Sequence, residues 1–340
     1  MKNRTGPLRR LALAATAAAL LAGADIGAAG AQALSMKIGT ATINDGQHEW
    51  MRRFADGVDK ATGGKLKPQL FPASQLGSIP RMIEGVQLGT IESYVGPGEF
   101  FVGVDPRFQV LGAPGVFETA DQVVRTIGDP AFRDRYLSLG EAKNLKGIDI
   151  LYLGTTGIVF TKPVRTLDDF KGKKIRVFGS PMHTTPMQMV GAAGTPLPLD
   201  EVLPSLQNGV VDGAFGTAAI FIPMKFYNLA KYWTVTNASP VTTLVVVGKS
   251  WFDKLPADVQ KAIVDVPKEI GPPMVEWCKD FDVKAQKAWV EAGGELIQLP
   301  PADRAEMMKR WSAVGTTVLA DKPAVKEVYD LMVRTAKSKL

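Results

Sequence analysis

The sequence has 340 residues, of which 46% are hydrophobic, with one cysteine and a formal net charge of +6. A chain of this length can bury a large core and usually divides into two units. The first 33 residues hold four of the basic residues and one acid, so the remaining chain has 36 basic and 33 acidic residues. This balance excludes the concentrated basic face that nucleic-acid binding needs. The lone Cys278 excludes an internal disulfide, and we expect it to be a buried structural thiol.

The N-terminus has the three parts of a secretory signal peptide. Four basic residues precede an apolar segment, Leu11 to Ala22, and Ala31-Gln32-Ala33 has the small-x-small pattern of a cleavage site. We therefore predict a signal peptide over residues 1–33 and a periplasmic mature protein. The pair Arg9-Arg10 leaves both general secretion and twin-arginine export open. No other apolar run is long enough to span a bilayer.

The rest of the chain alternates short apolar runs with amphipathic stretches, which predicts an α/β fold. The predicted strands are Met36–Thr40, Leu66–Phe71, Ile148–Leu153, Lys174–Phe178 and Leu244–Val247. The predicted helices are His48–Lys60, Pro80–Leu88, Leu203–Leu206 with its flanks, and Ala257–Val264.

A weak internal repeat suggests two related α/β lobes. The segment Val86–Glu92 matches Leu206–Asp212, since each ends a helix in Gln-x-Gly and continues into a β-branched strand start with an acid. Gly64–Lys67 and Gly172–Arg176 form a second matching pair before a strand. Two lobes of this kind predict a cleft where the carboxyl ends of their strands meet.

Prolines interrupt the C-terminal helical region. Pro267 and the run Gly271-Pro272-Pro273 are incompatible with a regular helix, so we expect the helix that starts near Ala257 to end there. A second amphipathic helix is then predicted from about Pro273 to Ala292. Its apolar stripe is interpreted as core or lobe-bridging surface.

Few reactive groups are available for catalysis. The chain has two histidines, His48 and His183, and neither lies in a metal-binding spacing. No Gly-x-Ser-x-Gly nucleophile motif occurs. We therefore expect no cofactor, no metal and no enzymatic activity, although an enzyme using either histidine as a base stays an open alternative.

Several ordered motifs carry a family resemblance over essentially the whole mature sequence. They are FPASQLGSIPRMIEGVQLGTIE (71–92), VRTLDDFKGKKIRV (164–177), GAAGTPLPLDEVLPSLQNGVVDGA (191–214), KFYNLAKYWT (225–234) and KSWFDKLPADVQKAI (249–263). With these motifs the chain resembles the DctP-type solute-binding proteins of tripartite ATP-independent periplasmic (TRAP) transporters.

The resemblance implies a two-lobed, periplasmic-binding-protein-like α/β fold of type II character, with a hinge and a ligand cleft between the lobes. We predict one lobe from residues 34–153 plus about 242–282, and the other from 154–241 plus about 283–340. Such proteins pass a small organic acid to the small and large subunits of a membrane permease. A monomer is the favoured state. Delivery to a sensor protein and a different polar solute stay open as alternatives.

Arg176 is the residue that the resemblance singles out. It interrupts an otherwise apolar strand, and in this family the matching arginine pairs with a ligand carboxylate. A guanidinium stays charged and its planar fork fits a carboxylate. From the residues alone, a side chain that faces solvent or a neighbouring acid is the alternative.

At other positions the chain departs from the family pattern. Thr156 stands where many acid-binding members have a second arginine, and Gly216 where many have an asparagine. By the same alignment, Pro97 falls where a pocket acid often lies and Leu199 where an aromatic ring often lies. The resemblance thus implies a pocket that is less polar than that of a sialic-acid or dicarboxylate binder.

These departures lead to a hypothesis about the ligand, a monocarboxylate with an apolar or aromatic body. Its charge would meet Arg176 while its body packs near Phe215, Leu199 and Phe178. The remaining candidates are Thr156, Ser180 and Gln75 as hydrogen-bonding groups, and His48 and Tyr94 from the first lobe. For His48 and Tyr94, ordinary capping or core packing is the alternative.

Overall fold

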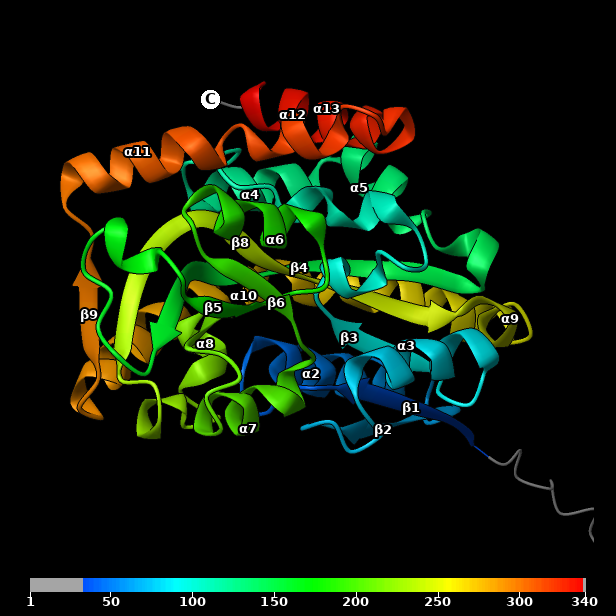
Figure 1. Ribbon diagram of the computed structural model, residues 1–340. Coiled ribbons are helices and arrows are strands. Elements are labelled where there is room, and N and C mark those ends of the chain that lie inside the picture. Colours follow the sequence, from blue (N-terminus) through cyan, green and yellow to red (C-terminus); the bar gives the residue numbers. More distant parts are fainter. Residues whose placement is uncertain (1–32, 339–340) are drawn as a thin grey trace, which may run out of the picture.

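The structure is a computed structural model that describes residues 33–338 (Figure 1). The predicted signal peptide therefore lies outside the described residues, except for Ala33. Within residues 33–338, no helix combines the length and the apolar character needed to cross a membrane.

A single mixed sheet runs through the molecule in the order β2-β1-β3-β8-β4-β7-β5-β6, and β9 pairs with β8. Helices cover it, with α11, α12 and α13 along the top of Figure 1 and α10 passing behind it. The strands are β1 Leu34–Thr40, β2 Leu66–Phe71, β3 Ser93–Gly96, β4 Leu145–Phe160, β5 Lys174–Val177, β6 Ala193–Pro196, β7 Gly213–Gly216, β8 Tyr232–Gly248 and β9 Glu295–Gln298. The predicted α/β class is thereby confirmed.

The helices begin and end close to the predicted bounds in the first part of the chain. They are α2 Gly46–Ala61, α3 Ile79–Leu88, α4 Ala120–Gly128, α5 Pro130–Leu137, α6 Pro181–Met189, α7 Val202–Gln207, α8 Ala218–Phe221, α9 Lys249–Phe252, α10 Ala257–Glu291, α11 Pro301–Trp311, α12 Val314–Leu319 and α13 Pro323–Lys337. Two 3-10 helices follow β3, η1 Gly98–Phe101 and η2 Pro106–Gly112.

The two halves of the sheet repeat one another, with β2-β1-β3 next to β8 and β6-β5-β7 next to β4. The predicted Gln-x-Gly repeat is confirmed, because Gly89 and Gly209 both have positive φ, 77° and 68°. The acid that ends each motif accepts a hydrogen bond from the backbone of a neighbouring strand. The Glu92 carboxylate accepts a hydrogen bond from the β1 backbone at 2.7 Å, and the Asp212 carboxylate accepts one from the β5 backbone at 2.8 Å.

The other predicted repeat is wrong. Gly64 precedes β2, which is an edge strand, whereas Gly172 precedes β5, which lies inside the sheet and corresponds to β1. Both glycines supply a positive φ before a strand, and that local requirement is enough to explain their likeness.

The long strands β4 and β8 pair with each other and connect the two halves of the sheet. Only fragments of them are predicted, because their middles are rich in glycine, threonine and proline. The register shifts around Gly154, which has φ 147°. There Asp282 of α10 accepts hydrogen bonds from the backbone and the hydroxyl of Thr155, at 3.2 and 2.9 Å. The carboxylate thus fastens α10 to the irregular part of β4.

The predicted break in the C-terminal helix is wrong, since α10 is continuous over 35 residues and contains Pro267, Pro272 and Pro273. A proline inside a helix removes a hydrogen bond and costs roughly 3 kcal/mol. The helix buries residues along its whole length, from Val259 to Trp289, and packs against α2, β4 and α8. This packing offsets the local cost. Cys278 lies on the same helix and is a buried free thiol, as expected.

The predicted lobe boundaries, 34–153 plus about 242–282 and 154–241 plus about 283–340, stay a proposal. One set of contacts bears on them, since α13 packs against η2, α4 and α5. We therefore propose to assign this last helix to the first lobe, unlike in the sequence-based division.

Candidate functional site

A small cavity lies where strands of both halves end at their carboxyl termini. Its volume is about 20 Å³, which is room for about one water molecule. The first half contributes β3 and the segments after β1, β2 and β3, and the second half contributes β5, β7 and the segments after β5, β6 and β7. Seven of the eleven predicted site residues line it: Tyr94, Pro97, Arg176, Phe178, Leu199, Phe215 and Gly216.

Arg176 is the buried charge of this cavity, with 2% of its surface exposed. Its Nε donates to the carbonyl of Leu197 at 3.0 Å and its Nη1 to that of Phe215 at 3.2 Å. No carboxylate among residues 33–338 lies within ion-pairing distance of it, so the alternative of a solvent-facing or acid-paired arginine is wrong. Burial lowers the pKa of Arg176 to about 9, which leaves it charged at neutral pH.

Aromatic rings surround this charge. The guanidinium carbon of Arg176 lies 4.9 Å from the ring centre of Phe178, a cation–π contact. Phe178 contacts Phe215 at 5.4 Å between ring centres and Phe100 of the first half at 5.5 Å. The site therefore offers one positive charge in largely apolar surroundings.

Tyr94 faces the same cavity from the first half of the sheet. It is fully buried, and its hydroxyl has no hydrogen-bond partner among the described residues. Burial, together with the negative charge of Asp200, raises the pKa of Tyr94, so the hydroxyl keeps its proton. An unpaired buried hydroxyl costs free energy, and a ligand that accepts its hydrogen bond would recover it.

Three predicted residues do not line the cavity. The Thr156 hydroxyl is buried between β4 and β8, where it donates to the carbonyl of Ser239 at 2.7 Å. Ser180 caps α6 by accepting from the amide of Met182 at 3.1 Å. Gln75 is exposed in the turn after β2.

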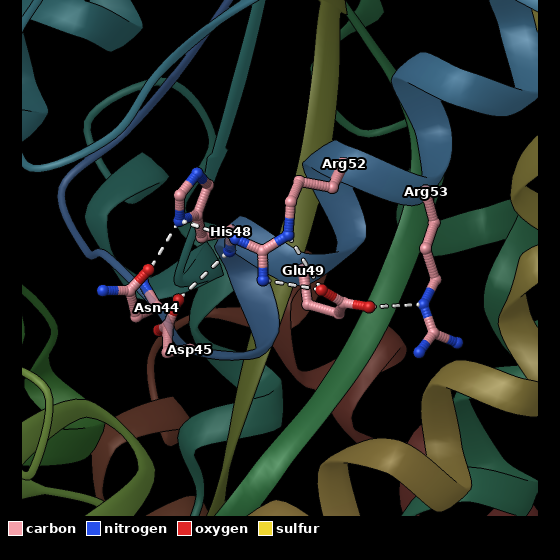
Figure 2. A network of polar contacts seen from close by, with 6 residues as sticks. All are labelled: Asn44, Asp45, His48, Glu49, Arg52 and Arg53. Atoms are coloured by element: carbon pink, nitrogen blue, oxygen red, sulfur yellow. Dashed lines mark hydrogen bonds and ion pairs between the residues drawn. The ribbon is translucent and has the colours of Figure 1, made fainter.

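His48 also lies outside the cavity lining, in a polar network at the start of α2 (Figure 2). Its Nδ1 accepts from the amide of Asn44 at 3.1 Å, and its own amide donates to Asp45 at 3.1 Å. Glu49 pairs with Arg52 and Arg53 nearby, at 2.6 and 2.8 Å. Partial burial and the charge of Arg52 lower the pKa of His48. The capping alternative therefore describes its position.

Sequence reasoning missed seven residues of the lining. They are Ala41, Thr42, Gln47, Ile79, Phe100, Ile220 and Phe221. Gln47 and Thr42 are the polar ones, and both are held from within the first half: Gln47 accepts from Thr40 at 3.1 Å, and Thr42 donates to Asp45 at 2.8 Å. Thr42 and Gln47 follow β1, and a loop after a strand is a general indication of a binding site. On that ground the sequence predicts His48, the residue next to Gln47.

The described lining of the cavity contains no histidine. No group of three or more candidate metal ligands occurs among the residues that the structure describes. Of the two histidines, His48 lies in the first turn of α2, and the ring of His183 packs on Phe178 and Phe215 with centres 5.0 and 4.8 Å away. A cavity between two α/β halves with a buried arginine defines a solute-binding protein of the two-lobed class.

Comparisons with known proteins agree with this class. Residues 39–320 match the family described as bacterial extracellular solute-binding protein, family 7, and the chain belongs to this family. Members of the family are solute-binding proteins of TRAP transporters for small organic acids or sugar acids, and they work with membrane permease components.

Two relatives with known ligands cover most of the chain. The 2,3-diketo-L-gulonate-binding periplasmic protein YiaO of Escherichia coli is 31% identical over 78% of this chain and 81% of its own. The C4-dicarboxylate-binding periplasmic protein DctP of Rhodobacter capsulatus is 28% identical over 78% of this chain and 79% of its own.

Among solved structures, a TRAP periplasmic solute-binding protein from Desulfovibrio salexigens with bound orotic acid has a TM-score of 0.85 at 28% identity. The match covers 90% of this chain and 99% of that one.

Proposed function

We propose that this protein captures a monocarboxylate with an apolar or aromatic body and delivers it to a TRAP permease without chemical change. The observation that carries the proposal is Arg176, a buried guanidinium without a carboxylate partner in an aromatic cavity. A buried charge without a counter-ion in contact is costly, and the more distant Asp200 offsets this cost only in part, so the cavity favours an anion. One charge favours one carboxylate.

The occupied hydrogen bonds of Arg176 constrain how the carboxylate binds. Nε and one hydrogen of Nη1 are committed to backbone carbonyls, while Nη2 donates to no described residue. The ligand would therefore be held end-on by the two terminal nitrogens. The rings of Phe178, Phe215 and Phe100 are placed to pack against its body.

Binding requires the cavity to open, because ligand pockets usually measure roughly 300 Å³ or more. Its walls come from both halves of the sheet, so moving these halves apart about a hinge would admit the ligand. Orotic acid, the ligand of the Desulfovibrio salexigens protein, has one carboxylate on a planar ring, and this supports the proposed class. Sugar acids and dicarboxylates are the competing classes.

A thermal-shift screen tests the ligand class. Orotate, benzoate, pantoate, succinate, galacturonate and gulonate would be compared at equal concentration. We expect aromatic monocarboxylates to raise the melting temperature most, because a ligand that binds only the folded protein stabilises it by mass action. Stabilisation by dicarboxylates or polyhydroxylated acids alone, with aromatic acids inert, would contradict the proposal.

Replacing Tyr94 with phenylalanine tests the first half's share in binding. Tyr94→Phe removes an unpaired buried hydroxyl, so the free energy of unfolding without ligand should stay equal or rise. Affinity for the best acid of the screen should fall about 5- to 10-fold, as expected for one lost hydrogen bond. Calorimetry and urea unfolding measure the two effects.

Tyr136→Phe is the matched control. Its hydroxyl donates to the carbonyl of Phe108 at 2.8 Å, so this variant should lose stability by about 1 kcal/mol and keep its ligand affinity. Unchanged affinity in Tyr94→Phe would assign Tyr94 to core packing.

A further inference from the structure

Two buried titratable side chains beside the ligand cavity have unused hydrogen-bonding groups. Glu99, on η1 in the first half, is 1% exposed, and its Oε2 has no hydrogen-bond partner in the described part of the chain. His183, on α6 in the second half, is 4% exposed, and neither ring nitrogen has a hydrogen-bond partner among residues 33–338. Neither residue is used in the proposed capture of a carboxylate.

The two side chains approach each other over a glycine. A β-carbon placed on Gly112 would lie 2.8 Å from Glu99 Oε1 and 3.0 Å from His183 Nε2. The missing side chain therefore leaves a gap between the carboxyl group and the ring. No direct hydrogen bond joins the two groups among the described residues, and one water molecule in this gap could link them.

A contact between the two halves of the sheet covers Glu99 and His183. Phe100, next to Glu99, packs on Phe178, and the Glu99 carbonyl lies 3.8 Å from where a side chain at Gly179 would begin. Separating the halves would remove this cover and admit water to the Glu99 carboxyl. The pKa of Glu99 is therefore expected to differ between the open and the closed arrangement of the two halves.

No charged group among the described residues pairs with Glu99 to compensate for its burial. Tyr136 of α5 is the further titratable group beside it, and its hydroxyl is already used by Phe108. On the elements packed against η1, Arg107 of η2 pairs with Asp105 at 2.5 Å. Arg81 and Glu84 of α3 are exposed. On the far side, Arg176 acts on His183 with a like charge.

We propose that closing the two halves binds a proton at Glu99, whose protonated carboxyl then faces the neutral ring of His183 and is linked to it through one water molecule. This inference rests on the proposed function in one respect, the closure of the halves around a ligand. It makes ligand capture dependent on pH through a group that does not touch the ligand.

The pKa values agree with the neutral form of both groups. Burial raises the pKa of Glu99 to about 8, while burial and the charge of Arg176 lower the pKa of His183 to about 3. In the open form a solvated glutamate has a pKa of roughly 4.3. Protonation of Glu99 therefore favours the closed form fully below the pKa of the open form. This free-energy contribution to closure is lost as the pH rises towards about 8.

The main test needs no ligand. Spin labels on cysteines that replace the exposed Glu84 and Glu201, in a Cys278→Ala background, report the distance between the halves. We expect the short-distance population to shrink between pH 5 and 9. Glu99→Gln, which imitates the protonated carboxyl, should keep this population over the whole range. The exposed Glu269→Gln is the control and should respond like the parent. Equal distributions in the parent and Glu99→Gln at every pH would overturn the proposal.

A second test uses orotate and the otherwise unchanged protein. Calorimetry at pH 7 in phosphate and in Tris counts the protons bound with the ligand, and we expect an uptake approaching one. The dissociation constant should rise by up to about tenfold per pH unit between pH 5 and 8. Orotate that binds with no proton uptake would contradict the inference. If orotate does not bind, the proposed ligand class fails for this acid. The spin-label measurement still shows whether protonation of Glu99 favours the closed form.

Discussion

Replacing Arg176 with alanine is expected to abolish ligand binding. The variant loses the cavity's buried charge and two terminal nitrogens, and each charge-assisted hydrogen bond is worth roughly 1.5–3 kcal/mol. The dissociation constant should therefore rise by at least about a hundredfold. Calorimetry with the best acid of the screen measures it, with circular dichroism as the check on folding.

Two further variants separate the role of the charge from that of the fold. Arg176→Lys keeps the charge but loses the planar fork, so most of the affinity should still be lost. Arg176→Ala also deprives the carbonyls of Leu197 and Phe215 of a donor, and we expect it to lower the free energy of unfolding by about 1–3 kcal/mol. Arg165→Ala, at an exposed arginine, should change neither property. If both Arg176 variants bind the ligand with unchanged affinity, Arg176 has a structural role only.

The largest expected loss of stability comes from replacing Asp149 with alanine. This buried carboxylate of β4 accepts from Arg133 of α5 at 2.6 Å, from Trp50 of α2 at 2.7 Å and from the amide of Ile150 at 2.8 Å. Its removal leaves a partly buried arginine and a fully buried indole N–H without their acceptor. Breaking such a pair on one side costs roughly 3–5 kcal/mol. Urea unfolding should show this loss, and the melting temperature should fall by about 10 °C.

The conservative replacement separates the charge from the hydrogen bonds. Burial raises the pKa of Asp149 despite the attraction of Arg133, so the charge itself is costly to bury. Asp149→Asn keeps one acceptor oxygen, enough for Arg133 and the Ile150 amide, which share Oδ1, but not for Trp50 on Oδ2. It should therefore lose less stability than Asp149→Ala. Asp258→Ala removes the partner of an exposed ion pair with Lys65 and should cost no more than about 1 kcal/mol. Equal stability of Asp149→Ala and Asp258→Ala would contradict this account.

Local patterns predicted much of the fold. The strands β1, β2 and β5 and the helices α2 and α3 follow from hydrophobic alternation and from their capping residues. Gly89 and Gly209 revealed the repeated helix-to-strand turn, because a positive φ is a local requirement. By contrast, α10 runs through three prolines because of packing against α2 and β4, which no local pattern displays.

The candidate site divides in the same way. The sequence by itself determined that the chain has few reactive groups and places an arginine in an apolar strand beside Phe178. Only the tertiary structure decided that Arg176 is buried without an ion-paired carboxylate and that Tyr94 lines the same cavity. It also decided that Thr156 and His48 lie outside the lining of this cavity. The position of Glu99 and His183 on either side of Gly112 was likewise invisible, since 84 residues separate them along the chain. Such contacts depend on how distant segments pack, and hydrophobic periodicity carries information only about each residue's near neighbours.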